Sequence, residues 1–179
     1  MVLFRMSKAR HSDDLSGKGA EIAGGRWNHR GLPALYLAGN RSLAIFETIV
    51  HCQYIKDLYN RLMLSIEVPE DNVEIFNTDH LPHDWNVTPW HNFTIDEGTK
   101  WLESFNALIL KIPSAIVPAE NIFMVNPRHS AFKKIKIRQK EEFKPDNRLE
   151  KIYPATLKNR WTNVSSSWPA TALSGQGSH

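Results

Sequence analysis

Cysteine is nearly absent from this chain of 179 residues. The single Cys52 excludes an internal disulfide framework and any zinc site built from several cysteines. A thiol nucleophile at Cys52 is one interpretation, although a cysteine in an apolar helical stretch is more often a small core residue. The chain also lacks a Gly-x-Ser-x-Gly sequence, which excludes the nucleophile elbow of the α/β-hydrolases.

Long apolar runs are missing too. No stretch reaches the roughly 20 apolar residues that a membrane-spanning helix needs. The apolar start, residues 1–4, meets Arg5 at once and does not have the pattern of a secretory signal. We therefore expect a cytoplasmic protein without membrane attachment, in which the glycosylation-like sequences at Asn86, Asn92 and Asn163 are chance matches.

An excess of one charge is absent from most of the chain. The 22 Lys and Arg residues outnumber the 19 Asp and Glu residues, and the isoelectric point is about 9.0. Residues 151–179 hold three of the basic residues and none of the acidic ones, so residues 1–150 hold 19 of each. A neutral body argues against a nucleic-acid-binding domain. The basic tail, with Trp161 and Trp168, keeps an RNA-directed or nucleic-acid-binding role as a separate hypothesis.

The length and composition indicate one folded domain with a sizeable core. We assign this domain to residues 1–150 and treat residues 151–179 as an atypical tail rich in Ser, Thr, Asn and Pro. The last residues, Gly177-Ser178-His179, have the composition of an expression-tag remnant.

Hydrophobic patterning predicts strands interrupted by two helices, and hence an α+β domain. The strands are expected near residues 2–5, 35–38, 63–68, 73–76, 107–112, 122–125 and 135–138. The first helix, residues 43–54, is apolar on nearly all sides, so we expect it to be buried, with Asn40 or Ser42 as its cap. The second helix is expected over residues 94–105, with Thr94 and Glu97 forming a capping box.

Glu47 lies in the first of these helices, where a carboxylate is unusual. Burial without a partner would cost several kcal/mol, roughly the penalty for a buried polar group. An ion pair with Arg26, Arg5 or Arg41, or a helix register that exposes Glu47, would remove this cost without any function. The structural and functional interpretations are equally open from position alone.

Three other positions have the chemistry of a binding site. Arg26 follows Gly24 and Gly25, which permit close backbone approach, and its planar guanidinium suits phosphate or carboxylate. Tyr36 points to the strand face opposite its neighbours, and Ser114 follows Pro113 at a strand end. Each has an ordinary alternative: a surface arginine, a core or surface tyrosine, and a turn serine.

Histidine clusters do not predict a metal site. His80, His83 and His91 fall in or near one irregular segment, without the helical or cysteine context of a ligand set. A solvated loop explains them better, and we expect neither a metal nor a bound cofactor.

Taken in order, many short segments of the chain resemble the RES domain, the toxin half of bacterial RES–Xre toxin–antitoxin pairs. The resemblance covers about residues 2–150. The matching segments are Phe4-Arg5, Gly24-Gly25-Arg26-Trp27-Asn28, Gly31-Leu32-Pro33 to Tyr36, Ser42-Leu43-Ala44 to Glu47, Val68-Pro69, Ile112-Pro113-Ser114, Val117-Pro118, Asn126-Pro127 with His129, and Phe143 to Leu149. Arg128 and Ala131 depart from the family pattern, but neither belongs to the core set.

The resemblance implies a mixed or antiparallel sheet with flanking helices, like the ADP-ribosyltransferase toxins, and an activity that consumes NAD⁺. By position, Arg26, Tyr36, Glu47 and Ser114 match the family's arginine, tyrosine, glutamate and serine, and Asn126 matches a further motif residue that would contribute to NAD⁺ binding. Arg26 would then hold the pyrophosphate, with help from the backbone at the glycine pair, including Gly25, and Tyr36 would stack on nicotinamide or ribose. Glu47 would stabilise an oxocarbenium-like ribose or bind its hydroxyls, and Ser114 would orient either Glu47 or the substrate amide by hydrogen bonding.

The resemblance leaves the acceptor of the ADP-ribose open. Water would give hydrolysis, inorganic phosphate would give phosphorolysis, and a protein side chain would give ADP-ribosylation. It also implies an Xre-like antitoxin that blocks the site and supplies any DNA binding, and it makes a homodimer an expectation. A non-catalytic interaction module is the remaining alternative, against which the complete set Arg26, Tyr36, Glu47 and Ser114 argues.

Overall fold

The computed structural model describes residues 1–52 and 54–151. The expected tail lies outside the described residues from residue 152 onward, so its boundary with the domain stays a prediction. The strands are β1 (Val2–Lys8), β2 (Leu35–Ala38), β3 (Arg61–Glu67), β4 (Val73–Ile75), β5 (Ile109–Pro113), β6 (Asn121–Val125) and β7 (Lys136–Glu142). The helices are α1 (Lys18–Ala23), α2 (Arg41–Ile49) and α3 (Asn92–Ser104), with short 3₁₀ turns at Ala9–His11, Ile55–Leu58, Thr78–His80, Ser130–Lys134 and Asn147–Lys151.

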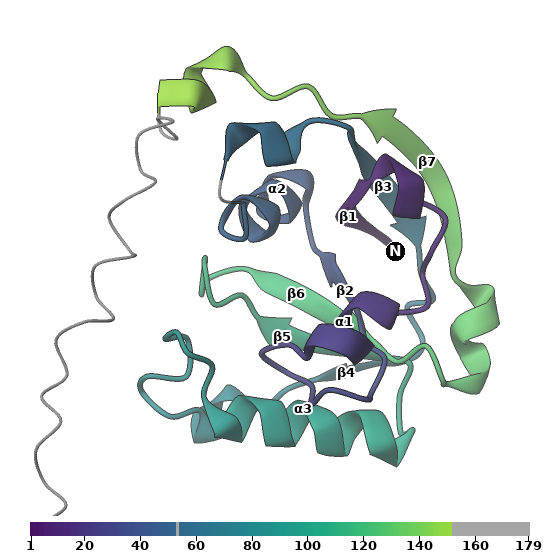
Figure 1. The fold of residues 1–179 in the computed structure, drawn as a ribbon. Helices are drawn as coiled ribbons and strands as arrows, with labels where there is room; N and C mark the ends of the chain where they lie inside the picture. The colour runs from purple at the N-terminus through teal and green to yellow at the C-terminus, as the bar shows by residue number, and fades with distance from the viewer. Residues whose placement is uncertain (53, 152–179) are drawn as a thin grey trace, which may run out of the picture.

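All seven described strands form one sheet in the order β4-β5-β6-β2-β1-β3-β7 (Figure 1). Every neighbouring pair is antiparallel except β4 and β5, which run parallel. The sheet is therefore mixed, and the expected α+β class is confirmed. Each expected strand is present, with bounds that differ by a few residues.

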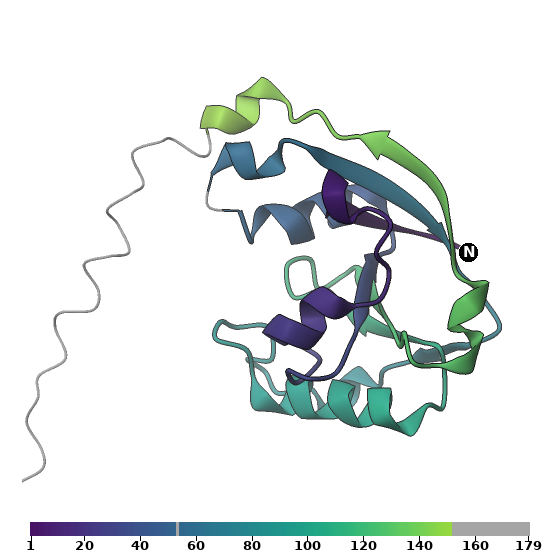
Figure 2. The ribbon, with the colours of Figure 1, turned by 45° about the vertical axis from the view of Figure 1, so that its right-hand side comes forward.

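The alternation along β2 separates two faces of the sheet. Leu35 and Leu37 belong to a core cluster on one face, and the side chains between them point to the other face. On that second face Tyr36 packs against a cluster that contains Trp101 of α3, while Ala38 belongs to a separate cluster beneath α2. Figures 1 and 2 show α2 and α3 well apart, with β2 and β6 between them. Tyr36 thus lies on the face of the sheet against which both α2 and α3 pack.

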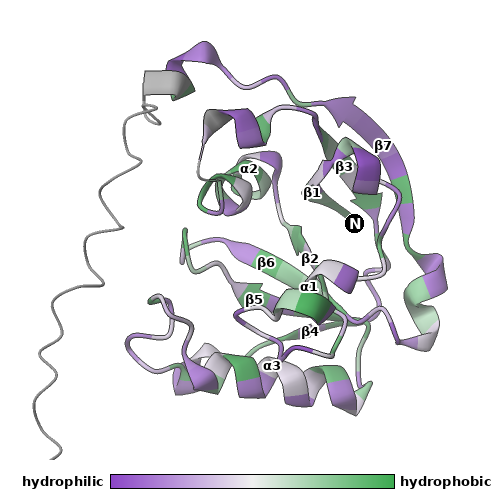
Figure 3. Cartoon of the chain, in the orientation of Figure 1, coloured by the Kyte–Doolittle hydropathy of each residue, from purple (hydrophilic) through white to green (hydrophobic). Residues whose placement is uncertain are grey.

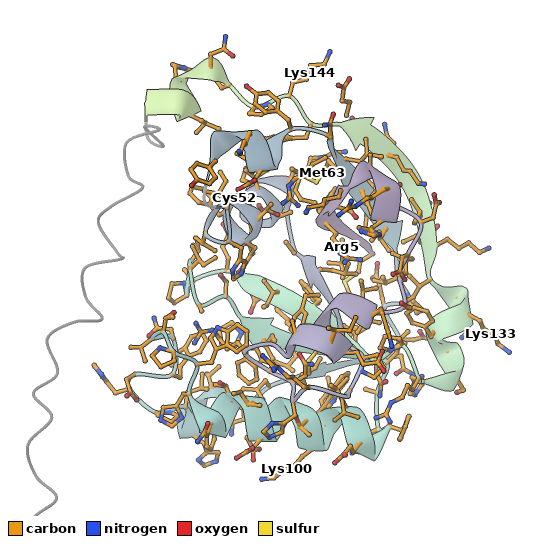
Figure 4. All side chains as sticks on the ribbon, in the orientation of Figure 1. Arg5, Cys52, Met63, Lys100, Lys133 and Lys144 are labelled. Atoms are coloured by element: carbon orange, nitrogen blue, oxygen red, sulfur yellow. The ribbon has the colours of Figure 1, made fainter. Side chains whose placement is uncertain are left out.

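The outer strand β7 is hydrophilic, as its colour in Figure 3 shows, and most of its residues are exposed. Lys133 and Lys144, which precede and follow β7, also stand out from the surface (Figure 4). Charged side chains along an edge strand discourage pairing with another chain. Among the described residues the longest helix, α3, has 13 residues, and no helix there has the length and apolarity to span a membrane.

The prediction of a buried first helix is wrong. The helix α2 ends at Ile49, and only Leu43 and Ala44 are buried in it. Phe46 and Val50 are each 52% exposed, because α2 contacts the sheet on one side only. Glu47 is consequently half-buried, and its carboxylate does not carry the full cost of an apolar interior. The expected cap is confirmed, since Asn40 accepts a hydrogen bond from the backbone N–H of Leu43.

The predicted capping box of the second helix is also wrong. The helix α3 begins two residues earlier, at Asn92, and the His91 ring accepts the backbone N–H of Phe93 at 3.1 Å. The fully buried Thr94 donates its hydroxyl to the carbonyl of His91. Glu97 pairs with Lys100 instead of the helix start. The ring of His91, a residue with extended backbone angles, therefore caps the start of α3 in place of the Thr94 side chain.

Gly98 determines how closely α3 approaches the turn that carries Arg26. A Cβ atom at Gly98 would lie 2.0 Å from the backbone oxygen of Trp27 and 2.9 Å from its Cβ. Trp27 is fully buried, so neither it nor its backbone can shift easily. The glycine therefore permits a contact that any side chain would prevent.

We predict that Gly98→Ala destabilises the protein by about 2 kcal/mol or more, because overpacking exceeds the gain in helix propensity. Gly19→Ala is the matched control, since a Cβ at this helical glycine meets no atom within 4 Å. Thermal and urea unfolding would compare the two variants. Equal stability of Gly98→Ala and the wild type would contradict the close packing of α3 on Trp27.

Candidate functional site

Glu47 of α2 and Ser114, which follows β5, are joined by a hydrogen bond across 67 positions of sequence. The Ser114 hydroxyl donates to Oε1 of Glu47 at 2.8 Å. Ser114 is fully buried, whereas Glu47 is half-buried. Among the described residues no hydrogen bond to Oε2 of Glu47 is present, so one carboxylate oxygen is fixed and the other is available to a ligand.

The Ser114 hydroxyl has no freedom to point elsewhere. Its oxygen accepts the backbone N–H groups of Ile116 and Val117, each at 3.1 Å. A hydroxyl has two lone pairs and one hydrogen, so both lone pairs are occupied and the hydrogen is directed to Glu47. Ser114 therefore cannot serve as a nucleophile in this arrangement. It acts as a positioning residue for the carboxylate.

The ion pairs that would have explained Glu47 structurally do not form. Arg41 pairs with Glu141 and also donates to Ser65. Arg5 donates to the backbone carbonyl of Asp14. Within the described residues no arginine or lysine lies in salt-bridge range of Glu47. The carboxylate is thus held by a neutral partner, which leaves its charge uncompensated by a direct contact.

Arg26 reaches across to the segment that precedes α3. Its Nη1 atom donates to the backbone carbonyls of Trp85 at 2.8 Å and Val87 at 2.9 Å. Burial lowers the pKa of the Arg26 guanidinium, and the nearby charge of Glu47 opposes that shift. The two charges are therefore close enough to interact. Because both Nη1 hydrogens are used, the Nε and Nη2 edge is left for bidentate binding of an anion.

A hollow of about 340 Å³ opens beside these contacts. Its walls come from the segment between Thr78 and Trp85, and from Pro113 and Pro118, which flank the Ser114 turn. In Figures 1 and 2, α2, the β5–β6 turn and the segment before α3 lie along the same side of the molecule. Arg26, Glu47 and Ser114 do not line the hollow themselves; it adjoins them through Trp85, whose carbonyl binds Arg26, and through Pro113, which precedes Ser114.

Tyr36 joins this region through its hydroxyl. The Oη atom donates to Oδ1 of Asn28 at 2.7 Å. Burial raises the pKa of the Tyr36 phenol above its usual range, while a hydrogen bond from the backbone of Trp27 opposes the shift. The phenol is therefore neutral at physiological pH, and its polar end is directed into the protein. Its ring, not its hydroxyl, is the part that can contact a ligand.

Gly25 allows this arrangement. A Cβ at Gly25 would lie 2.6 Å from Oδ1 of Asn28 and 3.0 Å from Oη of Tyr36. The absence of a side chain therefore makes room for an internal hydrogen bond next to Arg26. Gly24, with φ of 74°, provides the positive backbone angle that ends α1 and starts the turn.

Asn126 follows β6 at the end remote from the Ser114 turn, two residues beyond Met124, which is the register partner of Tyr36. The backbone N–H of Asn126 pairs with Leu108, whereas the backbone N–H of Ser114 pairs with Glu120 at the opposite end of the β5–β6 pair. Six residues of strand separate the two ends, which is about 20 Å. Asn126 is fully buried and donates to the carbonyl of Leu102 at 2.8 Å. Its amide ties α3 to the sheet.

The remaining candidates show structural contacts. The Cys52 thiol donates to the carbonyl of Thr48, and burial raises the pKa of the thiol, which disfavours the thiolate needed of a nucleophile. His91 caps α3, and His80 and His83 are exposed. Across residues 1–52 and 54–151, no group of three His, Cys, Asp or Glu side chains is arranged to hold a metal ion.

Sequence reasoning missed several parts of the site. The carbonyls that hold Arg26 leave no trace in side-chain patterns. Glu120, which accepts a hydrogen bond from the α2 cap Asn40, links the Ser114 turn to the helix of Glu47. Asn28 is the one of these residues whose role the sequence could have indicated, because an asparagine that closes a glycine-rich turn commonly forms hydrogen bonds with the neighbouring backbone.

Comparison with known proteins identifies relatives of this chain. The family profile described as "RES domain" matches residues 2–146. A protein of Yersinia enterocolitica named "Toxin Res" is 41% identical over 133 residues, which cover 74% of this chain and 88% of that protein. A protein of a Sphingobium species named "Prs ADP-ribosylating toxin" is 37% identical over 146 residues, covering 80% of this chain and 91% of that protein.

A solved structure shares the fold. It is a chain in the crystal structure of the M. tuberculosis MbcT–MbcA toxin–antitoxin complex, with a TM-score of 0.68 and 24% sequence identity. The match covers 87% of this chain and 89% of the other. The profile match over nearly the whole described domain and the close relatives agree with the resemblance seen in the sequence, and they show that the chain belongs to the RES-domain family.

Proposed function

We propose that this protein is the toxin of a bacterial toxin–antitoxin pair and that it inhibits growth by cleaving the nicotinamide–ribose bond of NAD⁺. The observation that carries this proposal is the Ser114–Glu47 hydrogen bond, which holds a carboxylate near the Arg26 guanidinium. The name of the Yersinia relative, "Toxin Res", supports the toxin role. NAD⁺ would be a consumed substrate, and the site would act in the cytoplasm, where NAD⁺ is abundant.

The proposed chemistry begins with departure of nicotinamide. The bond between C1′ of ribose and the ring nitrogen breaks, its electron pair leaves with nicotinamide, and positive charge develops on the sugar. The Oε2 atom of Glu47, which Ser114 leaves unoccupied, would stabilise that charge directly or through a ribose hydroxyl. An oxygen nucleophile then bonds to C1′ and loses its proton.

Arg26 and Tyr36 would bind the substrate. The Nε and Nη2 edge of Arg26 fits two oxygens of the pyrophosphate, and Gly25, by making room for the Asn28–Tyr36 hydrogen bond, would fix the backbone next to that group. The Tyr36 ring, fixed by its hydroxyl, would stack on nicotinamide or ribose. Cationic, aromatic and anionic groups thus correspond to the phosphate, base and ribose parts of one dinucleotide.

Water or inorganic phosphate is the acceptor in the main form of the proposal. ADP-ribosylation of a protein is the second candidate, because a relative at 37% identity is named an ADP-ribosylating toxin. All three reactions need the same cleavage at C1′, so the same residues serve each of them. They differ in which nucleophile enters after nicotinamide leaves.

An Xre-like antitoxin would be the partner and would provide any DNA binding. The structural relative comes from a toxin–antitoxin complex, which supports this assignment. Phe46 of α2 and Val50, the residue that caps the C-terminus of α2, are each 52% exposed near Glu47. A partner that covers these two apolar side chains would also restrict access to the carboxylate.

The first test is incubation of the full chain with NAD⁺ while nicotinamide release is followed with and without phosphate. We predict release by the wild type and a fall of about 100-fold or more in Glu47→Gln, which keeps the shape but not the charge. Glu67→Gln is the control, since Glu67 pairs with Arg138 on the surface. Free ADP-ribose would identify water as acceptor, and a phosphorylated product would identify phosphate. No release under either condition would refute the cleavage.

Arg26→Lys tests the proposed pyrophosphate contact. A lysine cannot hold two carbonyls and still present a bidentate edge, so we predict a KM for NAD⁺ raised by about tenfold or more. Arg30→Lys is the matched control, because exposed Arg30 makes one bond to the carbonyl of Ala23. A KM in Arg26→Lys equal to that of the control would exclude Arg26 from substrate binding.

Ser114→Ala tests the positioning of Glu47. The variant leaves the N–H groups of Ile116 and Val117 without a side-chain acceptor, so we predict a loss of about 1–3 kcal/mol in unfolding free energy. The kcat for nicotinamide release should fall with little change in KM, because Ser114 does not touch the substrate. Ser7→Ala, which removes a buried serine with a single 3.3 Å bond, is the control. Unchanged kcat in folded Ser114→Ala would contradict the role.

A further inference from the structure

Arg26 and Trp27 form the tip of a turn that is closed by Gly25 and Asn28. The N–H of Gly25 donates to the carbonyl of Asn28 at 3.0 Å, and the N–H of Asn28 donates back at 3.4 Å. Trp27 is fully buried, with its ring 4.9 Å from that of Phe76. One of the two tip residues is thus anchored in the core, and the orientation of the turn decides where Arg26 points.

The Asn28 side chain is fully committed to internal contacts. It is 1% exposed, and its Nδ2 atom donates to the carbonyls of Ala20, His29 and Leu32 at 3.0–3.1 Å. Its Oδ1 atom accepts the Tyr36 hydroxyl at 2.7 Å. The donors of one amide therefore fix the backbone on both sides of the Arg26 turn, while its acceptor fixes the Tyr36 ring.

We infer that Asn28 is a positioning residue of the site, whose buried amide holds the Arg26 turn and the Tyr36 ring in one fixed relation. The inference rests on the proposed function for the statement that NAD⁺ contacts these two residues. Asn28 itself would not touch the substrate, because its side chain is buried. Its effect would reach NAD⁺ only through Arg26 and Tyr36.

The chemistry of the amide separates this role from simple filling of space. Asn28→Asp preserves size and still accepts the Tyr36 hydroxyl, but its carboxylate cannot donate to three carbonyls. Asn28→Ala loses both functions. Tyr36→Phe keeps the ring and removes only the hydroxyl that Asn28 receives. Asn28→Asp therefore removes the donor groups of residue 28, Asn28→Ala removes its donor and acceptor groups, and Tyr36→Phe removes the hydroxyl that the acceptor binds.

The kinetic test measures kcat and KM for NAD⁺ in these three variants of the full chain and in the double variant Asn28→Ala with Tyr36→Phe. We expect KM to rise about tenfold in Asn28→Ala, with a smaller effect on kcat, as for a lost hydrogen-bonded contact. In the Tyr36→Phe background the same change should cost at least about threefold less, because the two side chains act together. Strictly additive effects on KM, or an unchanged KM, would overturn the inference.

Asn72→Ala is the matched control for stability. Asn72 is a half-buried asparagine whose side chain accepts the backbone N–H of Leu108, outside the proposed site. We expect it to lower the unfolding temperature without raising KM. Where Asn28→Ala fails to fold, Asn28→Asp carries the comparison, and a KM equal to that of the wild type in the folded Asp variant counts against the inference.

A second measurement does not depend on NAD⁺ at all. The chain has four tyrosines, so labelling them with ¹³C at the phenol carbon gives few signals, and Tyr36→Phe assigns the one of interest. We expect the Tyr36 signal to shift in Asn28→Asp and Asn28→Ala and to stay in place in Asn72→Ala. An unchanged Tyr36 signal refutes the positioning role, even where the wild type cleaves NAD⁺. A shifted signal in a protein that does not cleave NAD⁺ refutes the proposed function and leaves the positioning intact.

Discussion

The hydrogen bond from Ser114 to Glu47 is the contact on which the rest of the site depends. A serine hydroxyl usually has a choice of partners, but two backbone N–H groups of the following turn occupy its lone pairs. Its hydrogen can then go only to the carboxylate. A charged side chain on a half-exposed helix is thereby held through one carboxylate oxygen, while no hydrogen bond within the described residues occupies the second. This is a direct way to keep a charge ready for a developing cation.

The sheet explains why these groups meet. Ser114 lies at the end of β5, Tyr36 points to the face shared by the two helical layers, and Arg26 sits on a turn locked against α3 through Gly98. Ser114 and Tyr36 come from the sheet, Glu47 from α2 and Arg26 from the turn after α1, so the site combines several elements. The hydrogen bonds from Arg26 to the carbonyls of Trp85 and Val87 also connect the segment before α3 to this turn. The site is therefore a junction between elements.

The sequence predicted the seven strands well because their apolar residues alternate or run continuously, as in residues 35–38. It missed α1, whose six residues carry no apolar stripe and begin after a glycine with positive φ. It overestimated the burial of α2, since apolar composition does not reveal how many neighbours a helix has. Among the proposed site residues, Glu47 and Ser114 are joined by a hydrogen bond. Asn126 lies about 20 Å along the strands from Ser114, but only two residues from Met124, the register partner of Tyr36. The positioning role of Asn28 was not predicted, because it depends on hydrogen bonds to three backbone carbonyls, which a sequence pattern does not show.

A crystal structure of Glu47→Gln with bound NAD⁺ would test the proposed orientation of the substrate, because the substitution keeps the shape of the site while slowing cleavage. We expect C1′ of the nicotinamide ribose to lie against residue 47, with the pyrophosphate on the Nε and Nη2 edge of Arg26 and the Tyr36 ring stacked on the dinucleotide. Ser114 should still direct its hydroxyl to residue 47. NAD⁺ bound away from α2, or with its adenine end at residue 47, would contradict the account.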